Sequence, residues 1–562
     1  MPEGSWVSQL AQLVTLEVAL YTMAVLAGAT LRFAALDSRP LSMEEGTLAA
    51  ESYRLALAQP VDKLQQGPIG AFGTALALVL FGWGDGAARA LPALFGSLLV
   101  AVPYLLRDSL GRVPALLAAY GFAFSPLLLF ASRDVGAGAV PLTLAMLFIA
   151  LAERGLKSPT QPQAYGIALL SAGLLTSGVG GATILVTLAL AGLLAHPQLS
   201  ALLSDLRAAA SSPLWRRAGL LFAGSTLAVG TGLGTHLAGV QSVLVDVWSS
   251  WLGSLSFSAP RGGILVVIAL YELPVLLFGL IQLFRTMFQR RRFDMFLSLW
   301  LMLLLLLGMV QQTSATPRVV LPTLPLYLLA ARLVADGLPL LKGRGHGWSW
   351  NLVALFVTVP VIVAIVLLNR ATGSENDIPT PYLFGEATLV VVGSLAFTFL
   401  LHSREKLALV WCGVSILSLA FLLHTTVYLN YRMETLDREP IVGSQLSTSL
   451  RTAASQAAYF SAYYNQRVTV DPELRSATLW YLRDARDVRY STDAQDGISI
   501  ALIRSAQSKL DPSAERRAGL YLPSIEPRDA SWRSVWRWLV MRDGLVRPNQ
   551  RDIIVRAPAG NW

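Results

Sequence analysis

Two adjacent carboxylates, Glu44 and Glu45, lie in a polar segment that directly follows the first hydrophobic stretch of the chain. Arg32 and Arg39 lie close before them. Charged side chains where a membrane helix meets water cost free energy unless they serve a purpose there. A carboxylate can activate a hydroxyl or hold a divalent metal, and a guanidinium can bind phosphate. The pattern therefore indicates chemistry at a membrane surface.

Ser42 and Glu45 have the spacing of a capping box, in which each side chain bonds the backbone N–H of the other residue. This pattern predicts a helix over 43–57 and accounts for Glu45 without catalysis. Glu44 is less well explained, because a second carboxylate in a first helical turn gains only some tenths of a kcal/mol from the helix dipole. Glu44 is therefore the stronger candidate for a catalytic base, with Glu45 beside it.

Glu51 lies seven residues after Glu44, so the two side chains share one face of the predicted helix. Together they would converge on a divalent metal ion or a substrate hydroxyl, with Glu44 as the metal ligand. The structural alternative for Glu51 is an ion pair with Arg54 at i+3.

Two further arginines interrupt apolar sequence. Arg133 and Asp134 form a short polar turn between two hydrophobic stretches, which suits either a plain ion pair or a phosphate contact beside an acceptor-binding carboxylate. Arg318 stands alone among the prolines of 316–325. Its side chain would extend to the lipid headgroups or bind the phosphate of a lipid-linked substrate.

Glu17 and Glu272 are surrounded by apolar residues. An acid within a membrane is costly unless it is paired or protonated, so each marks an interhelical hydrogen bond or an ion path. An ion path would favour a transporter or flippase as the function of the chain.

Composition sets the class of protein. Of 562 residues, 54% are hydrophobic and 14% are charged, which is typical of a protein that crosses the membrane many times. The single cysteine, Cys412, excludes a disulfide framework and a cysteine metal site. The net charge of +9 comes largely from short loops between apolar stretches, so we expect no nucleic-acid partner. No Gly-x-x-x-x-Gly-Lys phosphate loop occurs, which argues against a nucleoside triphosphate as energy source.

About thirteen apolar stretches of roughly 20 residues or somewhat fewer are predicted to span a bilayer. They are 12–36, 86–106, 113–130, 135–152, 163–176, 179–195, 217–237, 262–284, 293–310, 318–338, 349–368, 384–401 and 407–429. The basic loops fall on one side of this alternation, which predicts that this side and the N-terminus are cytoplasmic. The membrane is then the cytoplasmic membrane, and the polar loops that carry the candidate residues face outward.

The sequence thus predicts a mainly α polytopic membrane domain over 1–430, with a first external loop at 37–85. Within that loop, an apolar segment beginning at Pro68 predicts an interfacial helix. After about residue 431 the apolar runs stop. A helix-like segment at 444–464 and strand-like segments at 467–470, 498–503 and 552–556 predict a small extracytoplasmic α/β domain over 431–562.

A set of motifs spread over the first 155 residues, with two later returns, resembles a known family. The motifs are Arg32, Leu36 to Pro40, the acidic pair, Gly67-Pro68, Leu80 to Gly82, Ala88 to Gly96, Leu110-Gly111, Phe124 to Pro126, Ser132-Arg133, Pro317-Arg318 with Pro322 and Pro325, and Leu479 to Arg483. Together they resemble the bacterial and archaeal GT-C-type membrane glycosyltransferases, relatives of the protein mannosyltransferases and aminoarabinose transferases. The nearest likeness is to the flippase activity-associated, dolichyl-phosphate-mannose-protein mannosyltransferase-like subgroup.

The resemblance implies a GT-C-like fold and transfer of a sugar from a polyprenyl-phosphate donor to a glycan or protein acceptor at the outer face of the membrane, amid its lipid. A loop carboxylate would activate the acceptor or hold a divalent metal ion, and arginines would stabilise the departing phosphate. The candidate site residues are then Glu44 and Glu45 as the acidic pair, Asp134 at the acceptor, and Arg39, Glu51, Arg133 and Arg318 as substrate contacts.

The sequence departs from the family at the acidic pair, which is usually Asp-Glu and here reads Glu44-Glu45. One added methylene moves a carboxylate by more than about an ångström, and misplacement on that scale can cost roughly a hundredfold in rate. The alternative function is therefore a non-catalytic membrane partner in lipid-linked glycan handling, which keeps the fold without the reaction.

Overall fold

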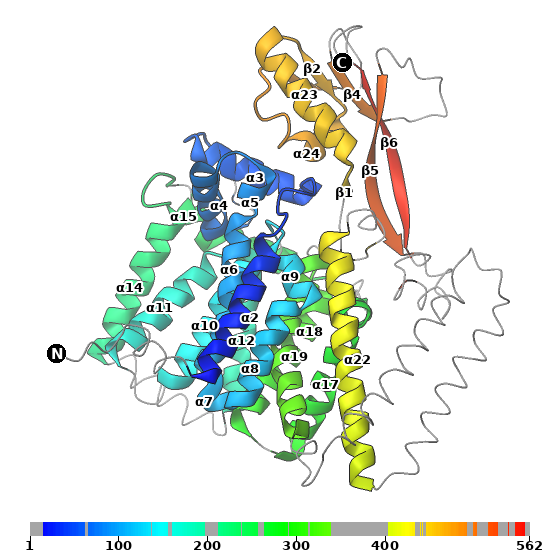
Figure 1. The fold of residues 1–562 in the computed structure, drawn as a ribbon. Helices are drawn as coiled ribbons and strands as arrows, with labels where there is room; N and C mark the ends of the chain where they lie inside the picture. Colours follow the sequence, from blue (N-terminus) through cyan, green and yellow to red (C-terminus); the bar gives the residue numbers. More distant parts are fainter. Residues whose placement is uncertain are drawn as a thin grey trace, which may run out of the picture.

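A bundle of long apolar helices carries a small mixed sheet at one end (Figure 1). The computed structural model describes residues 15–61, 64, 66–136, 138–155, 160–196, 212–237, 239–256, 263–289, 291–312, 315–338, 403–432, 439, 441, 445–491, 498–502, 515–525, 538 and 546–556. All structural statements below concern these residues.

Seven described helices are long and apolar enough to cross a membrane. They are α2 (Leu16–Phe33), the run Ala90–Leu110 formed by α6 (Ala90–Ala101), η1 (Val102–Leu106) and α7 (Arg107–Leu110), α12 (Gly178–Ala195), α17 (Ile264–Gln289), α18 (Arg292–Val310), α19 (Ala315–Gly337) and α22 (Ser403–Tyr431). The bent pair α8 (Arg112–Phe124) and α9 (Pro126–Ser132) would be an eighth span. The polytopic, mainly α fold is confirmed.

Other predicted spans also coincide with helices. These are α10 (Ala139–Gly155), α11 (Gln161–Leu175) and α14 (Pro213–Gly230), while short helices α15 (Gly239–Gln241), η2 (Ser242–Asp246) and α16 (Val247–Gly253) follow α14. The predicted spans at 349–368 and 384–401 lie outside the described residues. The count of thirteen is therefore not confirmed.

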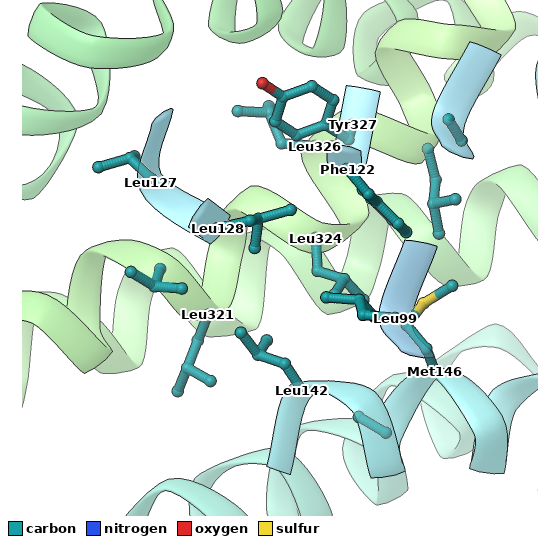
Figure 2. Packing of buried hydrophobic residues seen from close by; sticks show 14 of the residues in the cluster. Leu99, Phe122, Leu127, Leu128, Leu142, Met146, Leu321, Leu324, Leu326 and Tyr327 are labelled. Atoms are coloured by element: carbon teal, nitrogen blue, oxygen red, sulfur yellow. The ribbon is translucent and has the colours of Figure 1, made fainter. Parts of the chain in front are cut away.

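The core of the bundle surrounds α19, whose membrane-spanning window is 78% buried, against 22% for α2 and α22. Figure 2 shows Leu324 and Tyr327 of α19 among leucines and Phe122 of neighbouring helices. Glycines permit this close approach: a Cβ on Gly279 would lie 2.4 Å from Leu326, and one on Gly121 would lie 2.6 Å from the Tyr327 ring. Packing of this kind fixes the helix ends from which the polar loops emerge.

The acid Glu272 lies at a kink in α17, two residues before Pro274, and is wholly buried. Its Oε1 accepts a hydrogen bond from Ser125 Oγ at 2.6 Å and one from the Leu127 N–H at 3.3 Å, while the Tyr327 hydroxyl donates to Oε2. The carboxyl group thus bonds groups at the break between α8 and α9. Of the two interpretations open for Glu272, these contacts support the interhelical hydrogen bond.

Glu272→Gln is expected to lower the stability of the bundle by about 1–2 kcal/mol, because an amide offers only one acceptor oxygen to the three donors. Thermal unfolding in detergent, with Glu153→Gln at an exposed position as control, measures the difference. Equal stability of the two variants would contradict the prediction.

Glu17, the second acid in an apolar run, lies 3.7 Å from Arg107 and is partly exposed. This distance is that of an ion pair between α2 and α7. Both acids on which the transporter reading rested therefore have partners within the protein.

The predicted helices at 43–57 and from Pro68 are both present between α2 and α6, while their position at a membrane interface stays a prediction. Helix α3 (Met43–Ala56) begins with a complete capping box between Ser42 and Glu45, and α4 (Pro68–Phe81) begins with its proline in the first turn. A short helix, α5 (Asp85–Ala88), then leads into α6. Gly67 before α4 has φ +77°, and a Cβ there would lie 2.3 Å from the Gly178 backbone, so this entry requires glycine.

The C-terminal region forms the predicted α/β unit. It contains α23 (Thr448–Tyr464), η5 (Pro472–Leu474) and α24 (Arg475–Thr478), with strands β1 (Gln445–Leu446), β2 (Val468–Val470), β3 (Val488–Tyr490), β4 (Ile498–Leu502), β5 (Glu515–Ile525) and β6 (Val546–Arg556). The sheet order is β1-β5-β6-β4-β2-β3, with β2 parallel to β3 and β4 and the other pairs antiparallel. Buried side chains of this unit share one core with Leu41 and Leu48 of the first loop.

Candidate active site

Glu45 is fully enclosed and faces Arg89 at the start of α6. Arg89 Nε donates to Glu45 Oε1 and Arg89 Nη2 to Oε2, both at 2.8 Å. The Ser42 N–H donates to Oε2 at 3.0 Å and the Val135 N–H to Oε1 at 3.3 Å. Burial alone would raise the pKa of Glu45, but Arg89, Arg39 and the hydrogen bonds outweigh it and lower the pKa to about 2. This carboxylate is therefore ionised at neutral pH, and it stabilises the loop through Arg89 and the two backbone N–H groups.

All three nitrogen atoms of the Arg89 guanidinium donate hydrogen bonds to the first loop and the chain that leads into it. Besides Glu45, it donates to the carbonyl oxygens of Leu36, Arg39 and Pro40 at 2.8–3.1 Å. The side chain is 1% exposed. It therefore ties the chain that leaves α2 to the first turn of α3. No role was predicted for Arg89 from the sequence, although a lone arginine in an apolar run was a signal.

Arg39 links the two polar segments that the sequence singled out. Its Nη2 lies 3.4 Å from Glu45 Oε1 and 3.6 Å from Asp134 Oδ2, and it donates to the Arg133 carbonyl at 3.2 Å. The guanidinium also lies over the Phe130 ring, 5.0 Å from its centre. We call Arg89, Glu45, Arg39 and Asp134 the loop charge cluster. It contains two cations and two carboxyl groups.

Asp134 is the titratable member of the loop charge cluster near neutral pH. Burial and the negative charge of Glu45 raise its pKa to about 7, against the opposing effects of Arg39 and a hydrogen bond from the Gly136 N–H. The side chain is 16% exposed. A carboxyl group with such a pKa can donate a hydrogen bond when protonated or accept one when ionised.

Asp134→Asn is expected to stabilise the protein at pH 8 relative to wild type, by roughly 1–3 kcal/mol after allowance for the lost Arg39 pair. Between the ordinary pKa near 3.8 and the folded value of about 7, the unfolded state loses its proton and the folded state keeps it. Wild-type stability therefore falls as pH rises through that window, and the variant escapes this loss. Thermal unfolding at pH 5 and pH 8 measures the change, with exposed Asp108→Asn as control. A difference independent of pH would contradict it.

Glu44 differs sharply from its neighbour. Its side chain is exposed, and within the described part of the chain it makes no hydrogen bond or ion pair. Partial screening from water by the surrounding loop raises its pKa, and the charge of Glu45 raises it further. The same dipeptide therefore supplies one buried structural carboxylate and one carboxylate that is open to a substrate.

Arg133 contacts mainly backbone. Its guanidinium donates to four carbonyl oxygens at the end of α2 and just beyond, those of Leu31, Arg32, Ala34 and Ala35. It also lies over the Tyr431 ring, 4.8 Å from the centre. These contacts cap the C-terminal end of α2 and give Arg133 a structural role. Its predicted phosphate contact stays a prediction.

Arg318 and Glu51 lie on two different elements. Arg318, near the start of α19, is partly buried, and its Nη1 donates to the Gln311 carbonyl at 3.4 Å. Glu51 lies two turns after Glu44 on α3 and is partly buried. Arg54, its alternative partner, donates instead to the Pro60 carbonyl at 2.7 Å. The substrate contacts predicted for Arg318 and Glu51 stay predictions.

Metal binding by Glu44 has no further support from the geometry. Among the described residues, no group of three or more His, Cys, Asp or Glu side chains is placed to hold a metal ion. The metal-ligand role of Glu44 stays a prediction.

The sequence and the fold of the chain can be compared with those of known proteins. No family model matches the chain, and no curated protein matches it by sequence. Solved structures do match. ArnT from Cupriavidus metallidurans in the apo state has a TM-score of 0.54 and 16% identity, over 96% of this chain and 97% of that chain. The same protein bound to undecaprenyl phosphate gives a TM-score of 0.52 with equal identity and coverage. The chain therefore has the fold of ArnT along nearly its whole length, which confirms the GT-C-type fold that the sequence resemblance implied.

Proposed function

We propose that this protein is a membrane glycosyltransferase that moves a sugar from a polyprenyl-phosphate donor to a hydroxyl acceptor on a glycan or protein. The fold it shares with ArnT, a protein whose structure holds undecaprenyl phosphate, supports a polyprenyl-phosphate donor. The observation that carries the proposal is the difference between the two adjacent glutamates, of which one is buried in an ion pair and the other is exposed. Arg89 neutralises Glu45, while Glu44 is exposed and has no partner among the described residues.

Glu44 is the proposed general base. Its carboxylate takes the proton of the acceptor hydroxyl as the acceptor oxygen bonds to C1 of the sugar. The bond between C1 and the phosphate oxygen breaks, and the polyprenyl phosphate leaves with the electron pair. A base near the acceptor and cations near the departing phosphate are what such an inverting transfer needs.

Arg39 and Arg318 are the proposed phosphate contacts, and Asp134 the proposed acceptor contact. Arg39 is already balanced by two carboxyl groups, so protonation of Asp134 would increase the positive charge available to a phosphate. The pKa of Asp134, about 7, lets this occur near neutral pH. Arg133, whose carbonyl accepts a hydrogen bond from Arg39, holds the end of α2 and is a further proposed phosphate contact.

We infer that the reaction takes place at the outer face of the cytoplasmic membrane. Several basic residues lie at helix ends that the alternation of spans places on the side opposite the first loop. They are Arg107, Arg112, Arg154 and Arg285. The positive-inside rule makes that side cytoplasmic. The first loop and the sheet unit then face outward.

The test is transfer from labelled polyprenyl-phosphate sugars by purified protein in lipid nanodiscs, with wild type and Glu44→Gln compared. Parallel reactions with added divalent metal or chelator measure any metal requirement. Turnover by wild type that disappears in Glu44→Gln supports the proposal. Lipid binding without turnover of any donor would overturn it in favour of a non-catalytic partner in glycan handling.

A further inference from the structure

Asp85 of α5 connects the first loop to the C-terminal unit. It is 4% exposed, although it lies between two glycines in a short turn-like segment. Trp480 Nε1 donates to Oδ1 at 2.7 Å and the Tyr481 hydroxyl to Oδ2 at 2.9 Å, while Arg451 Nε lies 3.5 Å from Oδ2. One buried carboxylate thus accepts two hydrogen bonds and forms one ion pair with side chains of the C-terminal unit.

Tyr481 extends this contact to the start of α3. Its hydroxyl oxygen accepts a hydrogen bond from the Leu41 N–H at 2.8 Å. Leu41 is wholly buried and directly precedes the N-cap Ser42, three residues before Glu44. Tyr481 is 6% exposed, so the surroundings are largely closed to water. Without the hydroxyl, the Leu41 N–H would lose its partner.

The amides around Glu44 are held by side chains in succession. Tyr481 accepts from the Leu41 N–H, Glu45 Oε2 from the Ser42 N–H, and Ser42 Oγ from the Glu45 N–H at 3.1 Å. The last two bonds belong to the first loop alone. The first bond comes from the C-terminal unit, 440 positions away in the chain.

We propose that Tyr481 is a positioning residue for Glu44, which fixes the entry to α3 from the C-terminal unit through the Leu41 amide. This proposal rests on the proposed function and deepens it, because it gives the C-terminal unit a part in the transfer step. An error of about an ångström in the position of a catalytic group can cost a hundredfold in rate. Loss of one orienting hydrogen bond should therefore be visible in kcat.

Tyr481→Phe removes only the hydroxyl and keeps the ring. It is expected to lower kcat by about tenfold, while KM for the donor lipid changes by less than about twofold. Tyr53→Phe is the matched control. The Tyr53 hydroxyl also joins the two units, by donating to Asp484 Oδ1 at 2.9 Å, but it lies near the far end of α3. We expect wild-type kcat from Tyr53→Phe.

Hydrogen exchange supplies a second readout that does not need turnover. In wild type the Leu41 amide should be protected, and in Tyr481→Phe it should exchange faster while Tyr53→Phe leaves it unchanged. An unprotected Leu41 amide in wild type would overturn the proposal even if Tyr481→Phe failed to fold.

The kinetic outcomes separate the two proposals. If Glu44→Gln abolishes transfer and Tyr481→Phe retains wild-type kcat, or loses no more than Tyr53→Phe does, the positioning role is wrong and the proposed function stands. If wild type transfers no sugar, the proposed function fails and the positioning role fails with it.

Discussion

Glu44→Gln is expected to lower kcat for sugar transfer by about 100- to 10,000-fold, the usual contribution of a general base. The amide has nearly the same size and cannot take the acceptor proton. Because Glu44 is exposed and bonds no other described residue, its replacement should leave folding unchanged. KM for the donor should also stay close to wild type, since the change removes an interaction made in the transition state. Steady-state transfer in nanodiscs measures both constants.

The pH profile adds a second test of Glu44. Its raised pKa means that wild-type activity should fall as pH drops through a value above that of an ordinary glutamate. The residual activity of Glu44→Gln should lack this acidic limb. Glu153→Gln, which removes an exposed carboxylate near the opposite helix ends, is the control and should behave as wild type. Wild-type kcat in Glu44→Gln would exclude Glu44 as the base.

Glu44→Asp addresses the departure from the family pattern. The family that the sequence resembles usually has aspartate here, yet this loop holds the start of α3 through the capping box and the chain just before it through Arg89. If the loop is adapted to the longer side chain, the shorter one draws the carboxylate back by about an ångström, and kcat should fall by roughly 10- to 100-fold.

Features that depend on neighbouring residues could be predicted from the sequence. The capping box, the proline start of α4 and the strand at 468–470 all follow from patterns within a few positions, and the structure has each of them. Apolar runs are similarly local, so their positions match helices wherever the chain is described. The resemblance gave the overall fold, which the likeness to ArnT confirms.

The partners of the acidic residues could not be predicted in this way. Glu45 was predicted to cap a helix, and it does, but its strongest contact is Arg89, 44 positions later. Asp85 lies between glycines, where an acid usually indicates a solvated turn, and its partner Trp480 is 395 positions away. Periodicity carries no information on such pairs, because only packing of the helices and the sheet unit brings them together.

Contacts between distant parts of the chain bear on two of the charged residues. Arg133 was open between a simple surface pair and phosphate binding; its guanidinium caps α2, and the phosphate contact stays a prediction. Glu272 was open between a hydrogen bond and an ion path, and it bonds Ser125 and Tyr327. The contacts of Arg133 are carbonyl groups at the end of α2, whereas those of Glu272 are two side-chain hydroxyls and the Leu127 N–H.

Glu45→Gln is expected to destabilise the protein by about 3–5 kcal/mol, because it leaves the wholly buried Arg89 without its counter-charge. Glutamine still completes a capping box with Ser42, so the change isolates the ion pair from the helix cap. The pKa of Glu45, about 2, lies below that of an unfolded glutamate, near 4.5. The stabilisation that ionised Glu45 itself provides is therefore complete above about pH 4.5 and is lost as pH falls toward 2.

Removing both charges distinguishes the ion pair from other damage. Glu45→Gln combined with Arg89→Gln should recover part of the lost stability, since neither buried charge remains, although the carbonyls of Leu36, Arg39 and Pro40 lose donors. A double variant less stable than Glu45→Gln would contradict this account. The two glutamates then differ in kind: Glu44→Gln should give a folded protein without turnover, whereas Glu45→Gln should lose stability first and activity with it. That contrast follows from one buried arginine, which takes the charge of one carboxylate and leaves the next free for the acceptor.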